Sequence, residues 1–433
     1  MEVDVSGVHF VHVAGFADGT LRIYRVNDAD LALQRVFWAG FGSDPTEGQT
    51  GAALVDSPLF AGAWDVVLTP DGMSAVVSGR LSHRVVRLDK DAGTWVIRDS
   101  LEDGQETPLE IPVEGGGTEI LANLNVRGLD RPRGVALSPS GRAVYVSGYG
   151  DDAVARLGLN DDRLTYQGAF TDLPAPRQII ALPSASTATT TATATASAAP
   201  DVLYVLGGSA DTCDADDTQI IGLGLGELGP RVLQGISSSP EAFTCETAED
   251  PQDCLLDDLA LPGLIGGFGV AHTVTSSGAE YVLVASRCQG TVTAFERRSD
   301  DLLDYAGVYR IVAPWEAATV TATVASAAGL RNIEVHEGVV YAAAADGGFI
   351  AHFPLECVTA FTSLADPAVC AGVVCVDEAG GCAAAPSDAG AVSAHPWGLR
   401  AKDDVLYVTY DIEGQIAVFD IGDDGTPALR FVQ

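Results

Sequence analysis

Six large side chains recur at one position of an internal sequence repeat, immediately before the short apolar run with which each copy begins. Three of them are arginines and three are aromatic, namely Trp64, Arg133, Arg177, Phe268, Arg331 and Trp397. A guanidinium suits a carboxylate or phosphate because it can donate two parallel hydrogen bonds, and an indole offers a flat face to a sugar. If the fold brings these positions together, we expect them to bind a small anionic or sugar-like ligand.

The clearest copy of the repeat spans residues 131–170 and predicts four short strands. Its apolar runs cover residues 134–137, 144–146, 153–159 and 164–170, and Gly, Pro, Asn or Asp residues lie between them. Short apolar runs separated by such turns are typical of an antiparallel meander. One four-stranded meander cannot bury both of its faces, so it needs neighbouring copies.

Seven copies follow one another along the chain. Their approximate ranges are 1–37, 63–101, 131–170, 175–236, 266–310, 329–376 and 395–433. Radial repetition of four-stranded sheets is the pattern of a β-propeller, and seven blades lie within the usual range. The sequence therefore predicts an all-β fold with negligible helix, a single domain over residues 1–433 built as a seven-bladed β-propeller of four-stranded antiparallel blades. The stretches 38–62, 102–130 and 236–266 are expected to be connections between blades.

The best-preserved motif also carries a family resemblance. Residues 132–141 read P-R-G-V-A-L-S-P-S-G, and V-Y-V-S follows at 144–147. This motif resembles the YVTN-type repeat of lactonase-like seven-bladed β-propellers. For a lactonase, the resemblance implies a site at the mouth of the central channel for a small anionic sugar lactone. The same repeat occurs in electron-transfer subunits and surface proteins, so the resemblance does not select a function.

The propeller fold would place the six repeat residues at the channel mouth, and two interpretations then remain open. In the first, three arginines and three aromatic rings converge on a ligand. In the second, the aromatic rings plug the channel and the arginines pair with neighbouring carboxylates such as Asp65 and Asp130.

The charge of the chain excludes some classes of partner. The formal net charge is −35 at pH 7, and only two residues, Lys90 and Lys402, are lysines. Nucleic acids and anionic membranes require a basic patch, so neither is expected as a partner. No apolar run reaches the roughly 18 residues that a membrane-spanning helix needs. The acidity itself is typical of a strongly solvated surface.

The eight cysteines suggest an oxidising compartment. They lie only in the second half of the chain, at Cys213, Cys245, Cys254, Cys288, Cys357, Cys370, Cys375 and Cys382. None forms a C-x-x-C pair, which argues against zinc ribbons and c-type haem. We expect two disulfides among the first four and two among the last four, with three pairings open in each group. The alternative is a set of free thiols in a cytosolic protein.

No cofactor is expected, although one acidic loop could hold calcium. Its carboxylates are Asp211, Asp214, Asp216 and Asp217. Calcium takes six to eight oxygen ligands, but the EF-hand spacing and its glycine are missing here. A solvated acidic loop is the preferred interpretation. No G-x-S-x-G or H-E-x-x-H motif indicates a hydrolase.

Two classes of function follow from these observations. The favoured one is a non-enzymatic extracellular or periplasmic β-propeller of the cell surface. Such a protein would bind other surface proteins, copies of itself or a small anionic or sugar ligand. The alternative is a lactonase-like hydrolase that acts on a small anionic sugar lactone at the channel mouth.

Overall fold

The computed structural model describes residues 2–3, 9–27, 30–40, 53–113, 117–160, 163–185, 201–208, 218–226, 229–238, 255–256, 263–311, 329–359, 372–375, 395–410 and 415–432. The predicted fold class is confirmed, because the chain is an all-β, seven-bladed β-propeller whose sheets are each formed from consecutive strands. The chain divides into two compact units, Met1–Pro183 and Ser184–Gln433. They are called unit 1 and unit 2 below, and each is described by itself.

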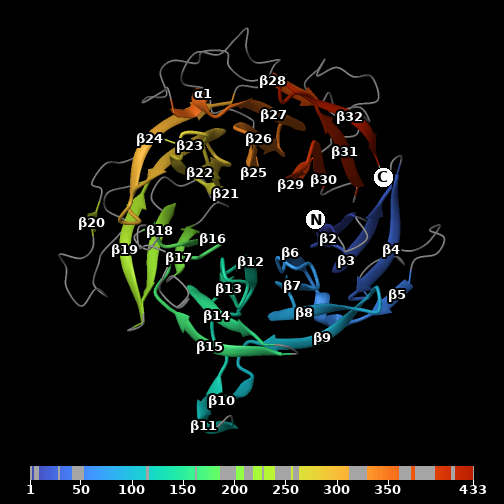
Figure 1. The fold of residues 1–433 in the computed structure, drawn as a ribbon, viewed down its shortest axis with the longest axis vertical. Helices are drawn as coiled ribbons and strands as arrows, with labels where there is room; N and C mark the ends of the chain where they lie inside the picture. Colours follow the sequence, from blue (N-terminus) through green and yellow to red (C-terminus); the bar gives the residue numbers. More distant parts are fainter. Residues whose placement is uncertain are drawn as a thin grey trace. The chain divides into compact units, whose positions relative to one another are not determined.

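Unit 1 contains the first three sheets, a separate hairpin and the first strand of the fourth sheet. Its strands are β1 (Glu2–Val3), β2 (His9–Gly15), β3 (Thr20–Val26), β4 (Leu31–Trp38), β5 (Ala53–Asp56), β6 (Ala63–Leu68), β7 (Ser74–Gly79), β8 (Arg84–Asp91), β9 (Thr94–Glu102), β10 (Glu106–Val113), β11 (Gly117–Asn125), β12 (Pro132–Leu137), β13 (Ala143–Gly148), β14 (Ala153–Leu159), β15 (Leu164–Phe170) and β16 (Gln178–Pro183), with the 3-10 helix η1 (Pro58–Phe60). The sheets run β1 to β5, β6 to β9 and β12 to β15 in sequence order (Figure 1).

Unit 2 contains the remaining strands of the fourth sheet and three further four-stranded sheets. Its elements are β17 (Asp201–Gly207), β18 (Gln219–Gly226), β19 (Gly229–Ser237), β20 (Leu255–Leu256), β21 (Gly267–Val274), β22 (Glu280–Ser286), β23 (Thr291–Arg297), β24 (Leu303–Arg310), β25 (Leu330–His336), β26 (Val339–Ala344), β27 (Phe349–Pro354), the helix α1 (Glu356–Thr359), β28 (Gly372–Cys375), β29 (Pro396–Lys402), β30 (Val405–Tyr410), β31 (Gln415–Ile421) and β32 (Pro427–Val432). Among the described residues, no helix has the length and apolar character needed to cross a membrane.

From the second sheet onward, the second strand of each sheet is strongly apolar because both of its faces are covered. In β13, Val144, Tyr145 and Val146 are fully buried. Two of these valines join a core cluster with Val76 and Val85 of the preceding sheet. A strand buried on both faces reads as a continuous apolar run, which explains the V-Y-V signal in the sequence. Unit 2 has a corresponding cluster between the sheets β21–β24 and β25–β28.

The predicted connection at 102–130 is wrong in one respect, because it contains a β-hairpin. Strands β10 and β11 pair antiparallel as a separate two-stranded sheet. The hairpin projects away from the sheets β6–β9 and β12–β15 of its own unit (Figure 1). Strand β10 contains two prolines, Pro108 and Pro112. Proline is tolerated in an edge strand, and a two-stranded sheet has an open edge on each strand.

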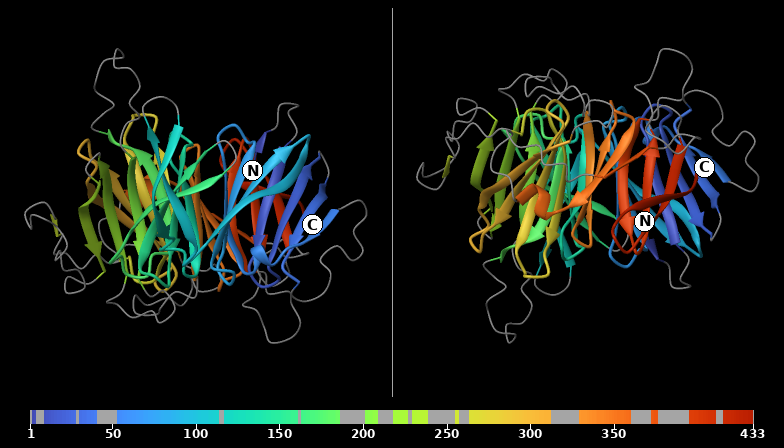
Figure 2. Two further views of the ribbon diagram at one scale, coloured as in Figure 1. Left: turned by 90° about the horizontal axis from the view of Figure 1, so that it is seen from below. Right: turned by 90° about the horizontal axis from the view of Figure 1, so that it is seen from above.

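Two other expected connections also contribute strands. Residues of β5 pair in parallel with β4, and residues of β20 pair in parallel with β19, so the first and fourth sheets have five strands. Each of these additions is only two to four residues long. Within each unit, the turns between strands gather at two opposite edges of the sheets, as the side views show (Figure 2).

Candidate functional site

Five of the six repeat residues lie at a β-bulge near the beginning of the first strand of their sheet. The pairing of β6 with β7 shifts around Trp64, and the pairing of β12 with β13 shifts around Arg133. In unit 2 the same shift surrounds Phe268, Arg331 and Trp397. A bulge leaves one residue out of the ladder and redirects its side chain. The sequence placed these residues just before the strand, whereas the structure places them inside it.

Arg177, the sixth repeat residue, directly precedes β16 and is held in place by a glycine of the motif. Gly134 donates its backbone N–H to the Arg177 carbonyl at 2.7 Å. The Ser147 hydroxyl donates to the same carbonyl at 2.9 Å. A Cβ on Gly134 would lie 2.6 Å from that oxygen, closer than real Cβ atoms approach any neighbour. The glycine of P-x-G is therefore the point at which the next first strand packs against β12.

Seven residues of unit 1 form a series in which arginines lie against aromatic rings, called the arginine–aromatic series below. They are Phe16, Arg80, Trp64, Arg133, Tyr149, Arg177 and Arg131. Guanidinium groups within about 6 Å of a ring centroid are attracted by its negative face. The series combines three of the predicted site residues from unit 1 with four that the sequence interpretation missed.

One end of the series is built around Trp64. The rings of Phe16 and Trp64 meet edge to face with centroids 5.1 Å apart. The Arg80 guanidinium carbon lies 5.1 Å from the Trp64 centroid and 5.3 Å from that of Phe16. Arg133 approaches the same indole at 5.1 Å. Trp64 thus contacts two guanidinium groups.

The other end gathers three arginines around Tyr149. The guanidinium carbons of Arg133, Arg177 and Arg131 lie 3.8, 5.3 and 5.5 Å from the centroid of its ring. Arg133 and Arg177 are 3% and 2% exposed, whereas the Arg131 side chain is 46% exposed. The two predicted arginines are therefore almost completely buried. Arg131 is the guanidinium of this group that solvent reaches.

A recognisable signal could have identified part of the missed set. Phe16, Arg80 and Tyr149 each follow the glycine that ends the second strand of their sheet. Loops that enter the first strand and loops that leave the second strand are at the same edge of a blade. The residue that follows the second strand is therefore expected to lie next to the repeat residue near the start of the first strand.

In unit 2 the corresponding residues form a closed group. The Arg331 guanidinium carbon lies 4.9 Å from the Phe268 centroid and 4.8 Å from that of Trp397. The two rings contact each other edge to face at 5.6 Å. Asp346 approaches Arg331 with a 3.7 Å ion pair and also lies 3.9 Å from Arg287. Arg331 is therefore paired with a carboxylate, which is one feature of the second interpretation.

The carboxylates of Asp65 and Asp130, predicted as partners of the arginines, make other contacts as well. Asp65 accepts the backbone N–H of Val135 at 3.0 Å. Asp130 lies 2.6 Å from Nδ1 of His83 and 3.7 Å from Nε of Arg131. Asp130 thus links the exposed arginine of the series to a histidine.

A group of carboxylates lies next to this contact. Asp151 accepts the backbone N–H groups of Gly128 and Asp130 at 2.7 and 3.2 Å. Asp103 accepts the N–H of Leu129 at 3.2 Å. Burial, together with the nearby charges of Asp151 and Asp130, raises the pKa of Asp103 to about 6, although the Leu129 hydrogen bond opposes the shift. Asp103 can therefore exchange a proton close to neutral pH.

Replacing Asp103 by asparagine is expected to stabilise the protein at pH 7.5 but not at pH 4. The folded state keeps the Asp103 proton up to about pH 6, whereas the unfolded chain loses it near pH 4. Wild-type stability therefore falls as the pH rises through this window. The gain for Asp103→Asn at pH 7.5 should be about 1 kcal/mol, a value reduced for solvent screening. Urea unfolding at the two pH values measures it, and an equal effect at both would refute the raised pKa.

Most of the remaining predicted site residues, which are the cysteines and the carboxylates of the acidic loop, lie outside the described residues. Cys288 and Cys357 are not free thiols. Nothing is described for the side chain of Cys375, and the other five cysteines lie outside the described residues, as do Asp211, Asp214, Asp216 and Asp217. The disulfide pairing and the calcium loop therefore stay predictions.

Comparison with known proteins identifies the fold. No family model and no curated protein matches the chain. The periplasmic gluconolactonase of Pseudomonas aeruginosa is a similar solved structure, with a TM-score of 0.53 and 13% identity over 97% of this chain and 94% of that one. A functionally unknown protein from Desulfotomaculum acetoxidans gives a TM-score of 0.52 and 11% identity over the same shares. At these identities the likeness shows the fold alone. The chain thus shares the seven-bladed fold of lactonase-like propellers, as its repeat motif predicted.

Proposed function

We propose that the protein binds a small anionic or sugar-like ligand through the arginine–aromatic series of unit 1. The observation that carries this proposal is the gathering of Arg131, Arg133 and Arg177 within 5.5 Å of one tyrosine ring. Three like charges repel one another, and the repulsion grows where water is excluded. An anion would relieve it. The three guanidinium groups lie together in a chain of net charge −35, and clustered cations attract anions.

The accessible end of the series is suited to first contact with the ligand. The Arg131 side chain is nearly half exposed, and its Cζ lies 5.5 Å from the Tyr149 centroid. A guanidinium next to an aromatic face can hold a carboxylate while a sugar ring lies on the aromatic surface. The buried Arg133 and Arg177 strengthen the positive potential behind this surface.

The same proposal places the protein at the cell surface or in the periplasm, as a non-enzymatic binding or structural protein. Its support is the set of eight cysteines, which suits an oxidising compartment. Disulfides among these cysteines belong to the proposal. Other surface proteins or further copies of the chain are the macromolecular partners that this role would involve.

A lactonase-like hydrolase is the second candidate, and the titration of Asp103 favours it. A carboxyl group with a pKa of about 6 is suited to general acid–base work near neutral pH. It lies in the group that Asp130 connects to Arg131. The similarity to a periplasmic gluconolactonase is compatible with this candidate but shows the fold alone.

Calorimetric titration with gluconate tests the binding proposal. Arg131→Gln should weaken binding about tenfold or more, because a charge-assisted hydrogen bond contributes about 1.5–3 kcal/mol. The matched control is Arg298→Gln, since the Arg298 side chain is 47% exposed and pairs with Asp300 in unit 2. The control should bind gluconate as the wild type does.

The outcomes of binding and hydrolysis assays would separate the candidates or reject the first. If gluconate does not bind, or if Arg131→Gln and Arg298→Gln bind it equally, the series is not the ligand site. Hydrolysis of glucono-lactone by the wild type, lost in Asp103→Asn, would instead establish the hydrolase. Absence of hydrolysis together with binding would support the non-enzymatic role.

A further inference from the structure

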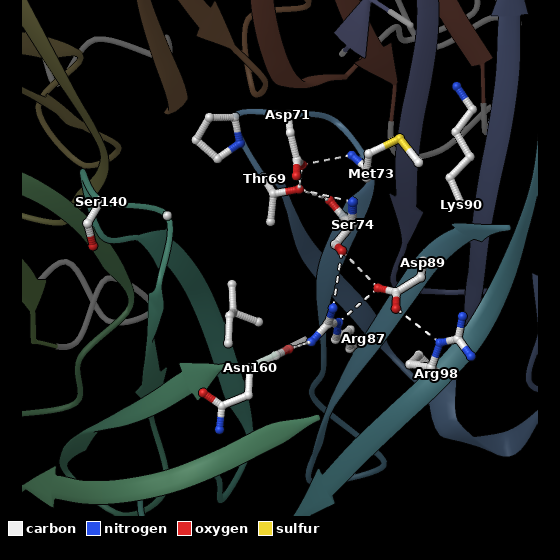
Figure 3. A pocket seen from close by; sticks show the side chains of 13 residues that line it. Thr69, Asp71, Met73, Ser74, Arg87, Asp89, Lys90, Arg98, Ser140 and Asn160 are labelled. Atoms are coloured by element: carbon white, nitrogen blue, oxygen red, sulfur yellow. Dashed lines mark hydrogen bonds and ion pairs between the residues drawn. The ribbon is translucent and has the colours of Figure 1, made fainter. Parts of the chain in front are cut away.

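A second concave site lies in unit 1, between the sheets β6–β9 and β12–β15. It is a cavity of about 550 Å³ (Figure 3). Thr69, which follows the last residue of β6, lines the cavity. Trp64 of the arginine–aromatic series lies near the other end of the same strand. The cavity, called the side pocket below, is therefore separate from the series.

Two turns of the repeat motif, one from each of the two sheets, line the side pocket and are called its rim turns below. Residues 69–72 read T-P-D-G and residues 138–141 read S-P-S-G, and both turns contribute to the lining. In the first turn, the Thr69 hydroxyl and the Met73 N–H donate to the Asp71 carboxylate at 2.6 and 3.0 Å. In the second, Ser140 lies 3.0 Å from the Ser138 hydroxyl. These hydrogen bonds hold the polar side chains of the two rim turns in place without a ligand.

A buried ion pair forms the inner wall. Nε of Arg87 donates to Asp89 at 2.8 Å, and the Ser74 hydroxyl donates to the same oxygen at 2.8 Å. Arg87 and Asp89 are 6% and 9% exposed. Nε of Arg98 donates to the second oxygen of Asp89 at 3.0 Å, and 42% of the Arg98 side chain remains exposed. Figure 3 shows Arg87 and Arg98 on either side of this carboxylate.

The lining carries a net positive charge, which is unusual for this chain. Three cations, Arg87, Lys90 and Arg98, face two carboxylates, Asp71 and Asp89. The chain has 59 acidic residues against 24 basic ones and only two lysines, one of which lies here. Asp89 is already held by two arginines and a serine, so its charge is largely compensated. The lining residues together keep a formal charge of +1, three cations against two carboxylates, and this charge would attract an incoming anion.

The shape and the remaining lining residues limit the size and character of the ligand. A volume of about 550 Å³ is within the range of small-molecule sites. Ser140 and Asn160 of the neighbouring sheet supply hydroxyl and amide groups, and Leu159 and the half-exposed Met73 supply apolar surface. This mixture is suited to a compact ligand that carries hydroxyl groups as well as an anionic group.

We propose that the side pocket is a second ligand site that binds a sugar-sized anion bearing a carboxylate or a phosphate. Arg98 contacts the anionic group from the exposed part of its guanidinium, and Lys90 adds positive charge at the rim. Arg87 and Asp89 position Arg98 and do not themselves need to reach the ligand. The site extends the proposed function without depending on it, because it uses none of the residues of the arginine–aromatic series.

Titration of the full chain with three probes tests this proposal. Glucuronate and glucose 6-phosphate represent the carboxylate and phosphate sources, and glucose is the neutral control. We expect at least one of the two anions to bind at least tenfold more tightly than glucose. Arg98→Gln should weaken that binding about tenfold, whereas Arg298→Gln should not change it. Thermal unfolding of both variants checks that Arg98→Gln remains folded.

Arg131→Gln separates the two sites. If the side pocket binds the anion, a binding step remains in Arg131→Gln and weakens in Arg98→Gln. The proposal is wrong if neither anion binds, if glucose binds as tightly as both anions, or if Arg98→Gln leaves every binding step unchanged. Loss of all binding in Arg131→Gln with none in Arg98→Gln would reject the side pocket and support the series alone.

Discussion

Asp301→Asn is expected to lower the free energy of unfolding by about 3 kcal/mol. The Arg297 and Asp301 side chains are 2% and 7% exposed and form an ion pair of 2.5 Å. Removing one partner of a buried pair usually costs about 3–5 kcal/mol, because it leaves the other charge buried. Glu280 also binds Arg297 at 2.8 Å, which places the expected loss at the lower end of that range.

Asp301 also makes hydrogen bonds to residues that are distant in the sequence of unit 2, so its replacement should weaken several of its contacts at once. The Asp301 carboxylate accepts the Ser184 hydroxyl at 2.5 Å and the Ala185 N–H at 2.8 Å. The Asp301 carbonyl accepts the Tyr204 hydroxyl at 2.7 Å. Asparagine is the chosen replacement because Asp301 has a φ of 67°, a conformation that asparagine adopts more readily than alanine.

The neighbouring residue provides the control for this prediction. Asp300 pairs with Arg298, and both side chains are nearly half exposed. An exposed pair contributes little to stability, so Asp300→Asn should unfold at the same urea concentration as the wild type. A double-mutant cycle with Arg297→Met measures the coupling directly. Equal urea midpoints for Asp301→Asn and Asp300→Asn would show that the buried network does not stabilise the fold.

Gly134→Ala should be almost as damaging and should also weaken ligand binding. The added Cβ would lie 2.6 Å from the Arg177 carbonyl oxygen and 2.9 Å from Cα of Gln178. Both are backbone atoms, so Arg177 and the start of β16 would have to move away from β12. Overpacking of a closely packed site costs about 1–3 kcal/mol, and we expect a value near 3 because no side chain can rotate aside.

Gly222→Ala is the matched substitution for comparison. Gly222 also lies inside a strand, β18, but the nearest atom to its added Cβ would be 3.6 Å away in the Tyr204 ring, an ordinary contact. Urea unfolding should therefore show a large loss for Gly134→Ala and a small change for Gly222→Ala. Gluconate affinity should fall only in Gly134→Ala, since that substitution displaces Arg177. Similar stability and affinity in the two variants would contradict the close approach at Gly134.

The fold could be predicted from the sequence because its signals are local and repeated. Apolar runs such as 144–146 mark strands that are buried on both faces, and the T-P-D-G and S-P-S-G turns separate first from second strands. The hairpin at 106–125 was missed because it pairs only with itself and belongs to no copy of the repeat, and its strand β10 contains two prolines, which an open edge strand tolerates.

The candidate site was predicted only in part, for a physical reason. Trp64, Arg133 and Arg177 could be recognised because they recur at one repeat position. The burial of the two arginines could not, because it depends on the bulge at Arg133 and on Tyr149, which follows another strand. Asp103 was missed because its raised pKa arises first from burial and then from Asp151 and Asp130, and neither the burial nor these contacts can be read from the local sequence.

A crystal structure of the protein grown with gluconate tests the central claim most directly. The account predicts the gluconate carboxylate within hydrogen-bonding distance of the Arg131 guanidinium, with the sugar chain against Tyr149 or Trp64. Gluconate bound elsewhere while Arg131 and Tyr149 remain without it at saturating concentration would contradict the claim.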